Sequence, residues 1–567
     1  MAAERRPLPP GPASERRTGL SLLLGASVLL SGCVTITRSD VSFGSNEPTP
    51  VASPIAIVAP SSQASPVASS VLPALTPRTS ASPHPSPAPV EAEVFGFLPY
   101  WLLETATTSI QPELLSTLAW FGVEASGEGR LVRRKSGEVP PGWLGMESQA
   151  FADLKSRLQG QGVRVVLTVQ RFGWNEGGAR RTSTLLRDAD ARARLARQIA
   201  TIVSERGFDG VNLDFEPMPE ELSDRYVDLV REVRAALDGV GEGLQLSVDV
   251  VSSLSGYDLA ALTAADAADL AIIMGYEYRG AGAPTTGSHA PLVDTSGRDL
   301  GASVRDAIAQ APAERVLLAL PWYGRAWSAE SADAGAATLR GERIGDPATV
   351  GFALAVEQAL TSGRAYEPTQ GSAWSAYPFR SCATCPETWR QVWYDDPDSF
   401  GAKVDHALSQ GLGGVGIWAL GFEADRPELW WALKGRLQPR IDEAPPNGSA
   451  SLDPATLGAE REGLPVATGS ATIRSFAADE QGGSGLGYVR AGLDPELGPD
   501  GELVLGRTFP ATTRVVLPLG DPAVGGSPEP GPRSIHVQWR DLAGNWSIPL
   551  VIRAWAASPA SAPVPAG

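Results

Sequence analysis

The 567-residue chain has few of the residues from which metal clusters and disulfide frameworks are built, with only 3 Cys and 4 His. These numbers exclude a disulfide-rich scaffold and a zinc cluster of Cys and His. Positive charge is also scarce, because 47 Lys and Arg stand against 64 Asp and Glu, a net charge of −17. Nucleic acid binding requires a basic face, so no nucleic acid partner is expected.

Long apolar runs are also missing. Beyond the N-terminal segment, no apolar run reaches the roughly 18 residues of a membrane span. Residues 1–33 combine four arginines, an apolar run over 20–30 and the ending Leu-Ser-Gly-Cys, which together indicate a bacterial export signal. That ending resembles the lipobox of bacterial lipoproteins, and an ordinary cleaved signal is the alternative. The resemblance implies lipidation of Cys33 and anchoring at the outer face of the cell membrane, in the cell envelope.

Residues 34–92 are rich in Ser, Pro and Ala and have few charges. Proline fixes φ and removes a backbone donor, so regular structure is disfavoured there. We predict a disordered tether that holds the following domain away from the membrane.

Eight short apolar runs, each followed by a helical pattern, occupy most of residues 93–436. Continuous apolar strands that alternate with helices indicate parallel β/α units covered on both faces. We therefore predict an α/β fold, a (β/α)8 TIM barrel, rather than a doubly wound open sheet, which usually has fewer strands and often a Gly-rich phosphate loop. The predicted strands are residues 94–99, 117–123, 163–170, 210–216, 244–250, 270–276, 316–321 and 414–418.

A small α+β insertion is expected between strands seven and eight, at about residues 326–395. It contains Cys382 and Cys385, whose spacing suits a redox pair or half of a metal site in a cytosolic protein. In an exported chain with no second such motif and no nearby His, we predict a local disulfide.

The segment Phe208–Glu216 reads FDGVNLDFE and carries the most chemical information. Side chains alternate along a strand, so Asn212, Asp214 and Glu216 are predicted to face the barrel interior. Burying two carboxyls costs free energy unless they are paired, so unpaired ones indicate a function. Glu216 lies nearest the C-terminal mouth, where barrel active sites lie, and its neighbour should raise its pKa. We predict that Glu216 is a proton donor; a structural polar plug is the alternative.

The run from Asp209 to Glu216 resembles the DxxDxDxE signature of family 18 glycoside hydrolases, with Asn212 in place of the middle Asp. Met274-Gly275-Tyr276-Glu277 resembles the family's MxYD, and LPWYGR at 320–325 and GVGIW at 414–418 resemble its seventh and eighth strands. The resemblance covers about residues 93–436, and the branch with the spore-cortex and cell-wall members is most similar. It implies a retaining hydrolase that uses the substrate's own 2-acetamido group as nucleophile.

The same resemblance implies the role of each residue, and no metal or cofactor. Glu216 would protonate the glycosidic oxygen, Asp214 would orient the acetamide and stabilise the oxazolinium ion, and Tyr276 would hydrogen-bond the acetamide carbonyl. Trp418 would stack on the sugar. Further candidate substrate contacts are Asp209, Asn212, Met274, Glu277, Tyr100, Trp101, Trp322, Tyr323 and Arg325.

Several of these residues have a structural role as the alternative to substrate contact. Asp209 stands at a strand start, where bracing of the strand is favoured over contact with sugar. Tyr100 and Trp101 form a stacking platform or fill the core, and Arg325 holds substrate or forms a structural ion pair. Asn212 and Glu277 depart from the family pattern, as does the segment 169–173, which replaces Ser-x-Gly-Gly on strand three.

Beyond the barrel we predict a linker over 437–470, an immunoglobulin-like β-sandwich over 471–557 and a tail over 558–567. Alternating stretches and the ending DLAGNWS favour this module. Its Trp539 and Trp546 are expected to pack in the core or a corner, with glycan binding as the alternative.

The leading hypothesis is a monomeric, envelope-tethered glycosidase that cleaves β-1,4 bonds in N-acetylglucosamine-containing polysaccharide. Chitin and peptidoglycan both remain open as substrates. The alternatives are a non-hydrolytic glycan-binding lipoprotein and a scaffold that displays the sandwich to a partner.

Overall fold

The computed structural model describes residues 92–438, 442–480 and 483–557. The predicted export signal, the lipidated Cys33, almost all of the tether and the tail lie outside these residues. Within the described part of the chain, none of the helices has the length and apolar character needed to cross a bilayer.

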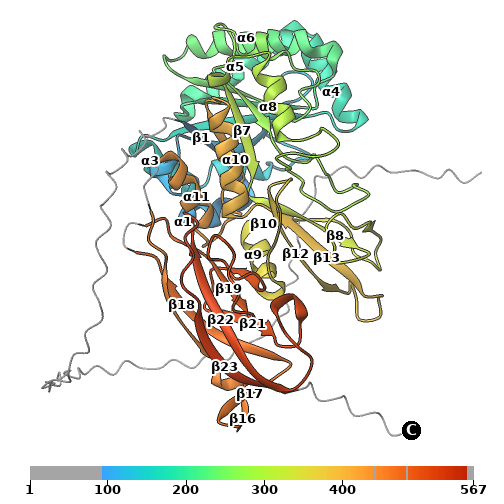
Figure 1. The fold of residues 1–567 in the computed structure, drawn as a ribbon. Coiled ribbons are helices and arrows are strands. Elements are labelled where there is room, and N and C mark those ends of the chain that lie inside the picture. The colour runs from blue at the N-terminus through green and yellow to red at the C-terminus, as the bar shows by residue number, and fades with distance from the viewer. Residues whose placement is uncertain (1–91, 439–441, 481–482, 558–567) are drawn as a thin grey trace, which may run out of the picture. The chain divides into compact units, whose positions relative to one another are not determined.

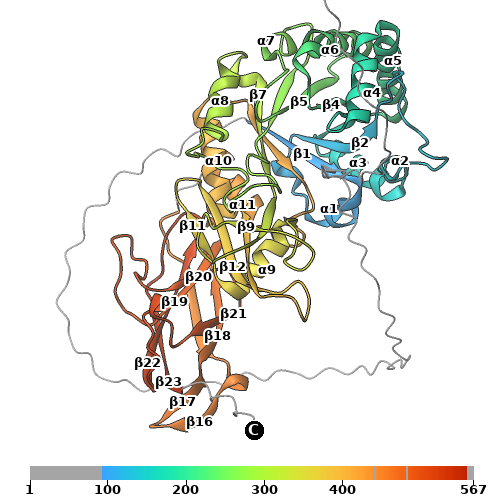
Figure 2. The same cartoon turned by 90° about the vertical axis from the view of Figure 1, so that its right-hand side faces the viewer.

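Figure 1 labels two strands of a closed barrel, β1 and β7, and Figure 2 also labels β2, β4 and β5. The eight parallel strands of this barrel have the order β1-β2-β3-β4-β5-β6-β7-β14, with β14 beside β1. This confirms the predicted TIM barrel and rules out the open sheet. The strands are β1 (Glu93–Pro99), β2 (Thr117–Glu124), β3 (Arg164–Phe172), β4 (Gly210–Glu216), β5 (Gln245–Val251), β6 (Leu270–Met274), β7 (Val316–Pro321) and β14 (Gly414–Trp418).

Helices surround the barrel, and their ends follow local sequence signals. The longest, α5 (Ala189–Arg206), begins where the Asp188 side chain accepts hydrogen bonds from two main-chain N–H groups, and it stops at Gly207, whose φ is 61°. The others are α1 (Leu103–Ser109), α2 (Pro141–Met146), α3 (Gln149–Gly160), α4 (Glu176–Arg187), α6 (Ser223–Asp238), α7 (Leu259–Leu262), α8 (Leu300–Ile308), α10 (Pro397–Ser409) and α11 (Glu428–Leu437).

The barrel has two separate apolar layers. A large cluster between strands and helices contains Val211, Leu213 and Phe215 of β4, together with the apolar faces of the surrounding helices. A small cluster fills the interior and contains Phe97, Ile272 and other inward-facing residues. Because β4 gives its apolar side chains to the outer layer, its polar ones face inward.

The predicted insertion is present and begins at Tyr323, immediately after β7. Its antiparallel sheet has the order β10-β8-β13-β12-β11, with the short β9 paired to β8. The elements are β8 (Tyr323–Ala329), β9 (Thr338–Leu339), β10 (Ala348–Gly351), α9 (Phe352–Ser362), β11 (Ala365–Glu367), β12 (Ser372–Phe379) and β13 (Thr388–Tyr394). Cys382 and Cys385 form a disulfide in the turn between β12 and β13.

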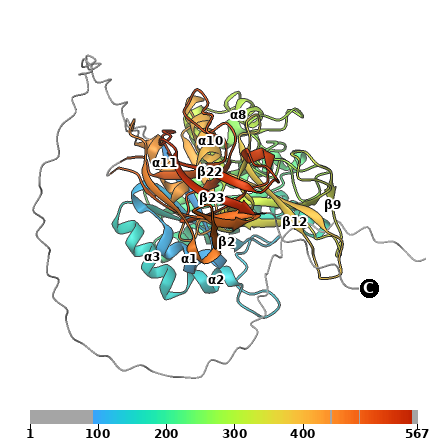
Figure 3. The same ribbon diagram turned by 60° about the horizontal axis from the view of Figure 1, so that its bottom comes forward.

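The C-terminal module is a β-sandwich of two sheets, β15-β18-β21 and β16-β17-β23-β22-β19-β20. Figure 3 labels β22 and β23, which are neighbours in the second sheet. Both sheets contribute to one apolar cluster, including Ile473 from the first sheet and Val537 from the second. Its strands are β15 (Asn447–Leu452), β16 (Gly458–Arg461), β17 (Leu464–Thr468), β18 (Ser470–Ala478), β19 (Leu486–Gly492), β20 (Arg507–Pro510), β21 (Arg514–Pro518), β22 (Gly531–Asp541) and β23 (Leu550–Ala557).

One boundary was wrong: β15, β16 and β17 lie within the predicted linker. The Gly, Ser and Ala of this stretch disguise its alternation, yet Ala450, Leu452 and Leu457 pack against the sandwich core. Trp539 is buried there and its indole N–H donates to Ser475 Oγ at 2.8 Å, which agrees with the packing role.

The sandwich contacts the barrel domain through polar and charged side chains at the start of helix α10. Tyr488 of β19 donates a hydrogen bond to Asp396 Oδ2 at 3.0 Å, and Arg540 of β22 binds Asp398 Oδ2 at 2.8 Å. Arg364, which follows α9, binds both of these carboxylates.

Candidate active site

The polar side chains of β4 lie inside the barrel, as the alternation predicts. Asn212 and Asp214 are buried and Glu216 is partly buried at the strand's C-terminal end. In the barrel register Asp214 pairs with Gln170 and Glu216 pairs with Phe172, both on β3. The acid candidate is therefore at the mouth, and the second carboxyl lies one inward-facing position deeper.

Burial and mutual repulsion suit these two carboxyls to proton transfer. Burial raises the pKa of Glu216 to about 7, and a hydrogen bond from Trp174 opposes part of that rise. Burial also raises the pKa of Asp214 well above its usual range, and the charges of Glu216 and Asp249 add to the effect. A carboxyl with a pKa near 7 carries a proton at neutral pH often enough to donate it.

A third carboxyl, which the sequence analysis missed, belongs to the same cluster. Asp249 of β5 is 3% exposed, and its Oδ2 accepts a hydrogen bond from Asn212 Nδ2 at 2.7 Å. Ser247 Oγ donates to Asn212 Oδ1, also at 2.7 Å. The sequence signal was present, because Ser247 and Asp249 alternate with the apolar Val248 and Val250 as Asn212 and Asp214 alternate on β4.

Aromatic side chains surround the polar cluster. Tyr276 and Trp418 both pack against the interior cluster of the barrel. The Trp418 indole lies 4.8 Å from the ring of Phe121 and 5.7 Å from that of Phe97, measured between centroids. Burial keeps the pKa of Tyr276 well above its usual value, so its hydroxyl stays protonated and able to donate. This arrangement provides an apolar floor and a neutral donor beside the carboxyls.

Glu277, Tyr323 and Arg325 form a compact polar group next to Tyr276. Tyr323 donates its hydroxyl hydrogen to Glu277 Oε1 at 2.8 Å, and Arg325 forms an ion pair with the same oxygen. Glu277 has a φ of 60°, in the left-handed region that few non-glycine residues adopt. Arg325 thus forms the structural ion pair that was one of its two predicted roles.

One predicted substrate contact, Trp322, is wrong, and Asp209 has the bracing role that was favoured for it over contact with sugar. Trp322 is fully buried in the outer layer, where it packs edge-on against Trp430 and Phe400, because side chains alternate across the end of β7. Asp209 precedes β4 at the end of the barrel opposite the mouth. Its Oδ2 accepts hydrogen bonds from the main-chain N–H of Val165 at 2.7 Å and from Gln159 at 2.8 Å, which braces the strand.

The other predicted contacts lie near the C-terminal ends of the strands. Met274 ends β6 on its inward face, and Tyr100 and Trp101 follow β1, with their rings edge-on at 4.8 Å. Trp101 is 49% exposed and Trp174, which follows β3 and was missed, is 43% exposed. Large exposed aromatic side chains at a barrel mouth offer flat faces to a sugar ring.

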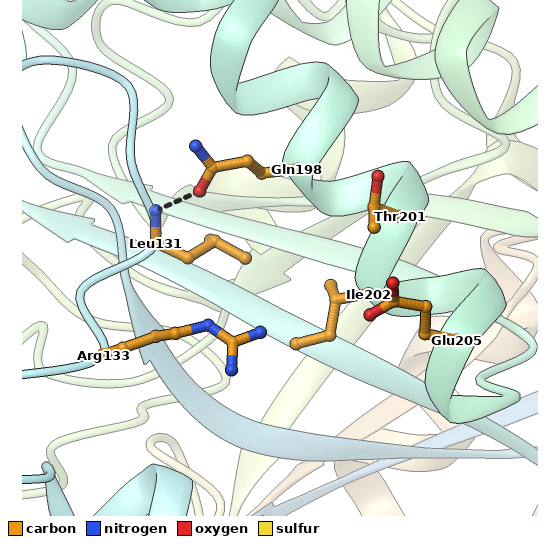
Figure 4. Close-up of a pocket in the computed structure, with 6 residues that line it drawn as sticks. All are labelled: Leu131, Arg133, Gln198, Thr201, Ile202 and Glu205. Atoms are coloured by element: carbon orange, nitrogen blue, oxygen red, sulfur yellow. Dashed lines mark hydrogen bonds between the residues drawn. The ribbon is translucent and has the colours of Figure 1, made fainter.

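Two other features have no connection to this cluster. A hollow of about 220 Å³ is lined by Leu131 and Arg133 and by the α5 residues Gln198, Thr201, Ile202 and Glu205 (Figure 4). In the sandwich region, one carboxylate oxygen from each of Asp442, Asp479 and Asp541 lies within 4.8 Å of the other two. Each already accepts a hydrogen bond from a main-chain N–H, so we assign no ion to them.

Comparison with known families identifies the barrel. Residues 119–423 match the model of Glycosyl hydrolases family 18. The chain belongs to this family. The match covers more than half of the chain and agrees with the resemblance seen in the sequence.

Relatives of this family 18 protein include bacterial glycosylases and chitinases. It is 26% identical to the sporulation-specific glycosylase YdhD of Bacillus subtilis over 242 residues, 42% of this chain and 52% of that protein. It is 27% identical to Chitinase C of Streptomyces lividans over 253 residues, 41% of this chain and 38% of that protein. The matches thus span about half the length of these relatives, or less.

Solved family 18 structures share the fold. Catalytic domain 2 of the Ostrinia furnacalis Group II chitinase aligns with a TM-score of 0.53 and 21% identity, over 62% of this chain and 98% of that one. The GH18 chitinase of Cycas revoluta, solved with (GlcNAc)3, aligns with a TM-score of 0.51 and 22% identity, over 61% and 99% of the two chains.

Proposed function

We propose that the protein is a retaining glycosidase that cleaves β-1,4 linkages in N-acetylglucosamine-containing polysaccharide. The observation that carries this proposal is Glu216, a carboxyl at the barrel mouth whose pKa is raised to about 7. Family membership and the chitinase relatives support the sugar specificity. Glu216 protonates the glycosidic oxygen, so that the bond to the leaving sugar breaks as the proton arrives.

The substrate supplies the nucleophile in this scheme. The carbonyl oxygen of its 2-acetamido group attacks the anomeric carbon and forms an oxazolinium ion, while Asp214 stabilises the positive charge on the acetamide nitrogen. The Tyr276 hydroxyl donates a hydrogen bond to the acetamide, and Trp418 stacks on the apolar face of the sugar. Glu216, now ionised, removes a proton from water, which opens the oxazolinium ring and leaves the product with retained configuration.

The first test is turnover of a chromogenic N-acetylglucosamine oligomer by the wild-type protein and by Glu216→Gln. The amide has the shape of the acid but no proton to donate, so turnover should fall by about 100-fold or more while binding persists. A wild type that binds the oligomer without hydrolysing it would instead favour the non-hydrolytic glycan-binding protein. Equal turnover by both proteins would remove Glu216 from the mechanism.

We further propose that the enzyme is exported and held at the outer face of the cell membrane through lipidated Cys33. The ending Leu-Ser-Gly-Cys supports this location. A Cys33→Ala variant should shift from the membrane fraction to the soluble fraction of the cell envelope. Retention of this variant in the membrane would contradict the anchor.

Chitin and peptidoglycan are separate substrate candidates for the same site. Chitinase C supports the first, and the predicted envelope tether and the resemblance to the cell-wall branch of the family support the second. Reducing-end analysis of products from both purified polymers separates them, because new N-acetylglucosamine reducing ends appear only on the polymer that is cleaved.

A further inference from the structure

Asp249 is the buried carboxyl of the site that the proposed mechanism leaves without a task. It lies on β5, whose Val248 and Val250 belong to the outer apolar layer, so Asp249 faces the barrel interior. The barrel places β5 directly beside β4 (Figure 2). A buried carboxyl is expensive without partners, so its position calls for a physical explanation.

The hydrogen bonds around Asn212 fix the orientation of its amide. Ser247 Oγ donates to Asn212 Oδ1 and Asn212 Nδ2 donates to Asp249 Oδ2, each at 2.7 Å. Asn212 stands where the family pattern has its middle Asp. The Asn212 amide therefore binds the carboxyl of Asp249, so the acid that is absent from β4 at this position is present on the neighbouring strand β5.

Two oxygens of the cluster are left over. Asp214 Oδ1 and Asp249 Oδ1 are both buried and have no hydrogen-bond partner. The β4–β5 register pairs Leu213 with Val248, and Asp214 and Asp249 come next on their strands, on the same face. Two neighbouring buried carboxylates resist double ionisation, and one proton between them would satisfy both free oxygens.

We propose that Asp249 is a positioning residue that shares one proton with Asp214. The inference rests on the proposed glycosidase function, because Asp214 acts on the substrate's acetamide group there. In the resting site the proton is on Asp214 Oδ1. As positive charge develops on the acetamide, the proton moves to Asp249 Oδ1 and leaves Asp214 anionic, and it returns when the oxazolinium ring opens. Asn212 donates to Asp249 Oδ2 throughout.

Among the residues that the structure describes, Glu216 and three tyrosine phenols interact electrostatically with this pair, and of these only Glu216 titrates near neutral pH. Burial keeps the phenol pKa values far above neutrality, so the phenols stay neutral. The phenols concerned are Tyr226 of α6, Tyr257 after β5 and Tyr276 after β6.

The test is the pH dependence of kcat/KM in Asp249→Asn and Asp249→Ala. A carboxylic acid O–H donates to Asp214 more strongly than an amide N–H does, and alanine donates nothing. Asp214 should therefore stay ionised down to a lower pH in the wild type, where Asp249 donates to it, than in either variant. We expect the acid limb to move to higher pH by about half a unit in Asp249→Asn and further in Asp249→Ala.

A carboxyl exchange provides the matched control. The double variant Asn212→Asp/Asp249→Asn returns the acid to β4 and puts the amide on β5, so its acid limb should move back toward that of the wild type. Acid limbs of both single variants that coincide with the wild-type limb would overturn the proposal. A double variant that keeps the limb of Asp249→Asn would also overturn it.

A second measurement does not depend on turnover. Burial raises the pKa values of Asp214 and Asp249, so the proposed pair keeps one proton at neutral pH, where an unfolded Asp holds none, and its stability falls as pH rises. In Asp249→Asn the slope of the unfolding free energy against pH should decrease by up to about one proton. The exposed Asp266→Asn is the control and should keep the wild-type slope. An unchanged slope in Asp249→Asn refutes the shared proton, whereas an inactive wild type refutes the glycosidase function alone.

Discussion

At the scale of single residues, the ability of Glu216 to hold a proton at neutral pH depends on its position in the barrel. The same side chain at the surface would ionise near pH 4.3 and hold no proton at neutral pH. Its place at the end of β4 raises the pKa to about 7 by burial. The mechanism therefore needs no unusual residue, only a partly buried acid beside a second carboxyl.

The pH profile of the wild-type enzyme follows from that pKa. The acid must be protonated, so kcat/KM should fall as the pH rises through about 7. The pKa of Glu216 is higher in the folded protein than in the unfolded chain, so its proton stabilises the fold at low pH. This stabilisation is lost as the pH rises through the folded pKa. Glu216→Gln should accordingly melt at a higher temperature than the wild type at pH 8. An equal or lower melting temperature would contradict the buried, protonated acid.

Asp214→Asn tests the role of the deeper carboxyl. An interaction that strengthens as charge develops affects the transition state more than the bound substrate. We expect kcat to fall by about 100-fold, with KM within about threefold of the wild type. Steady-state kinetics on the chromogenic oligomer measures both. A rise in KM with an unchanged kcat would assign Asp214 to ground-state binding instead.

At the scale of elements, apolar periodicity predicted all eight barrel strands and the helices that alternate with them. The inward face of β4 followed from alternation alone, because its apolar residues needed the helical layer. Asp249 was missed although it alternates with apolar residues as Asp214 does, because a single acid on β5 matched no motif. Trp322 was misplaced because a motif gives a residue's position in the chain and not the side of the strand that it faces.

The bracing of β4 is testable at this scale. Asp209 Oδ2 accepts hydrogen bonds from the main chain of β3 and from Gln159 of α3. Asp209→Ala leaves both donors without this acceptor, so the unfolding free energy should fall by about 1–3 kcal/mol. KM should not change, because the residue is at the end opposite the mouth. Chemical denaturation and steady-state kinetics provide the two readouts, and a raised KM with unchanged stability would reverse the assignment.

At the scale of the whole molecule, charged contacts join the sandwich to the catalytic part. Asp396 begins α10 and is 2% exposed. Burial alone would raise its pKa, but the Arg364 guanidinium overcomes this effect and lowers it. Sequence patterns could not reveal this contact, because it depends on residues that lie far apart in the chain.

Arg540→Ala measures how far this contact contributes to stability. Arg540 binds Asp398 at 2.8 Å and lies over the ring of Tyr488. Its removal should lower the unfolding free energy by about 1–3 kcal/mol, and the loss should shrink in high salt. Arg553→Ala, an exposed position on β23 of the same sandwich, is the matched control and should change stability little. Equal effects of the two variants would show that the contact contributes nothing.

The most direct measurement of the central claim is the anomeric configuration of the first product, followed by NMR during hydrolysis of a β-1,4-linked N-acetylglucosamine tetramer. An acid at Glu216 that works with the substrate's own acetamide predicts the β-anomer, with no cleavage of the matching glucose tetramer, which lacks that group. An α-anomer as the first product, or hydrolysis of the glucose tetramer at a comparable rate, would contradict the account.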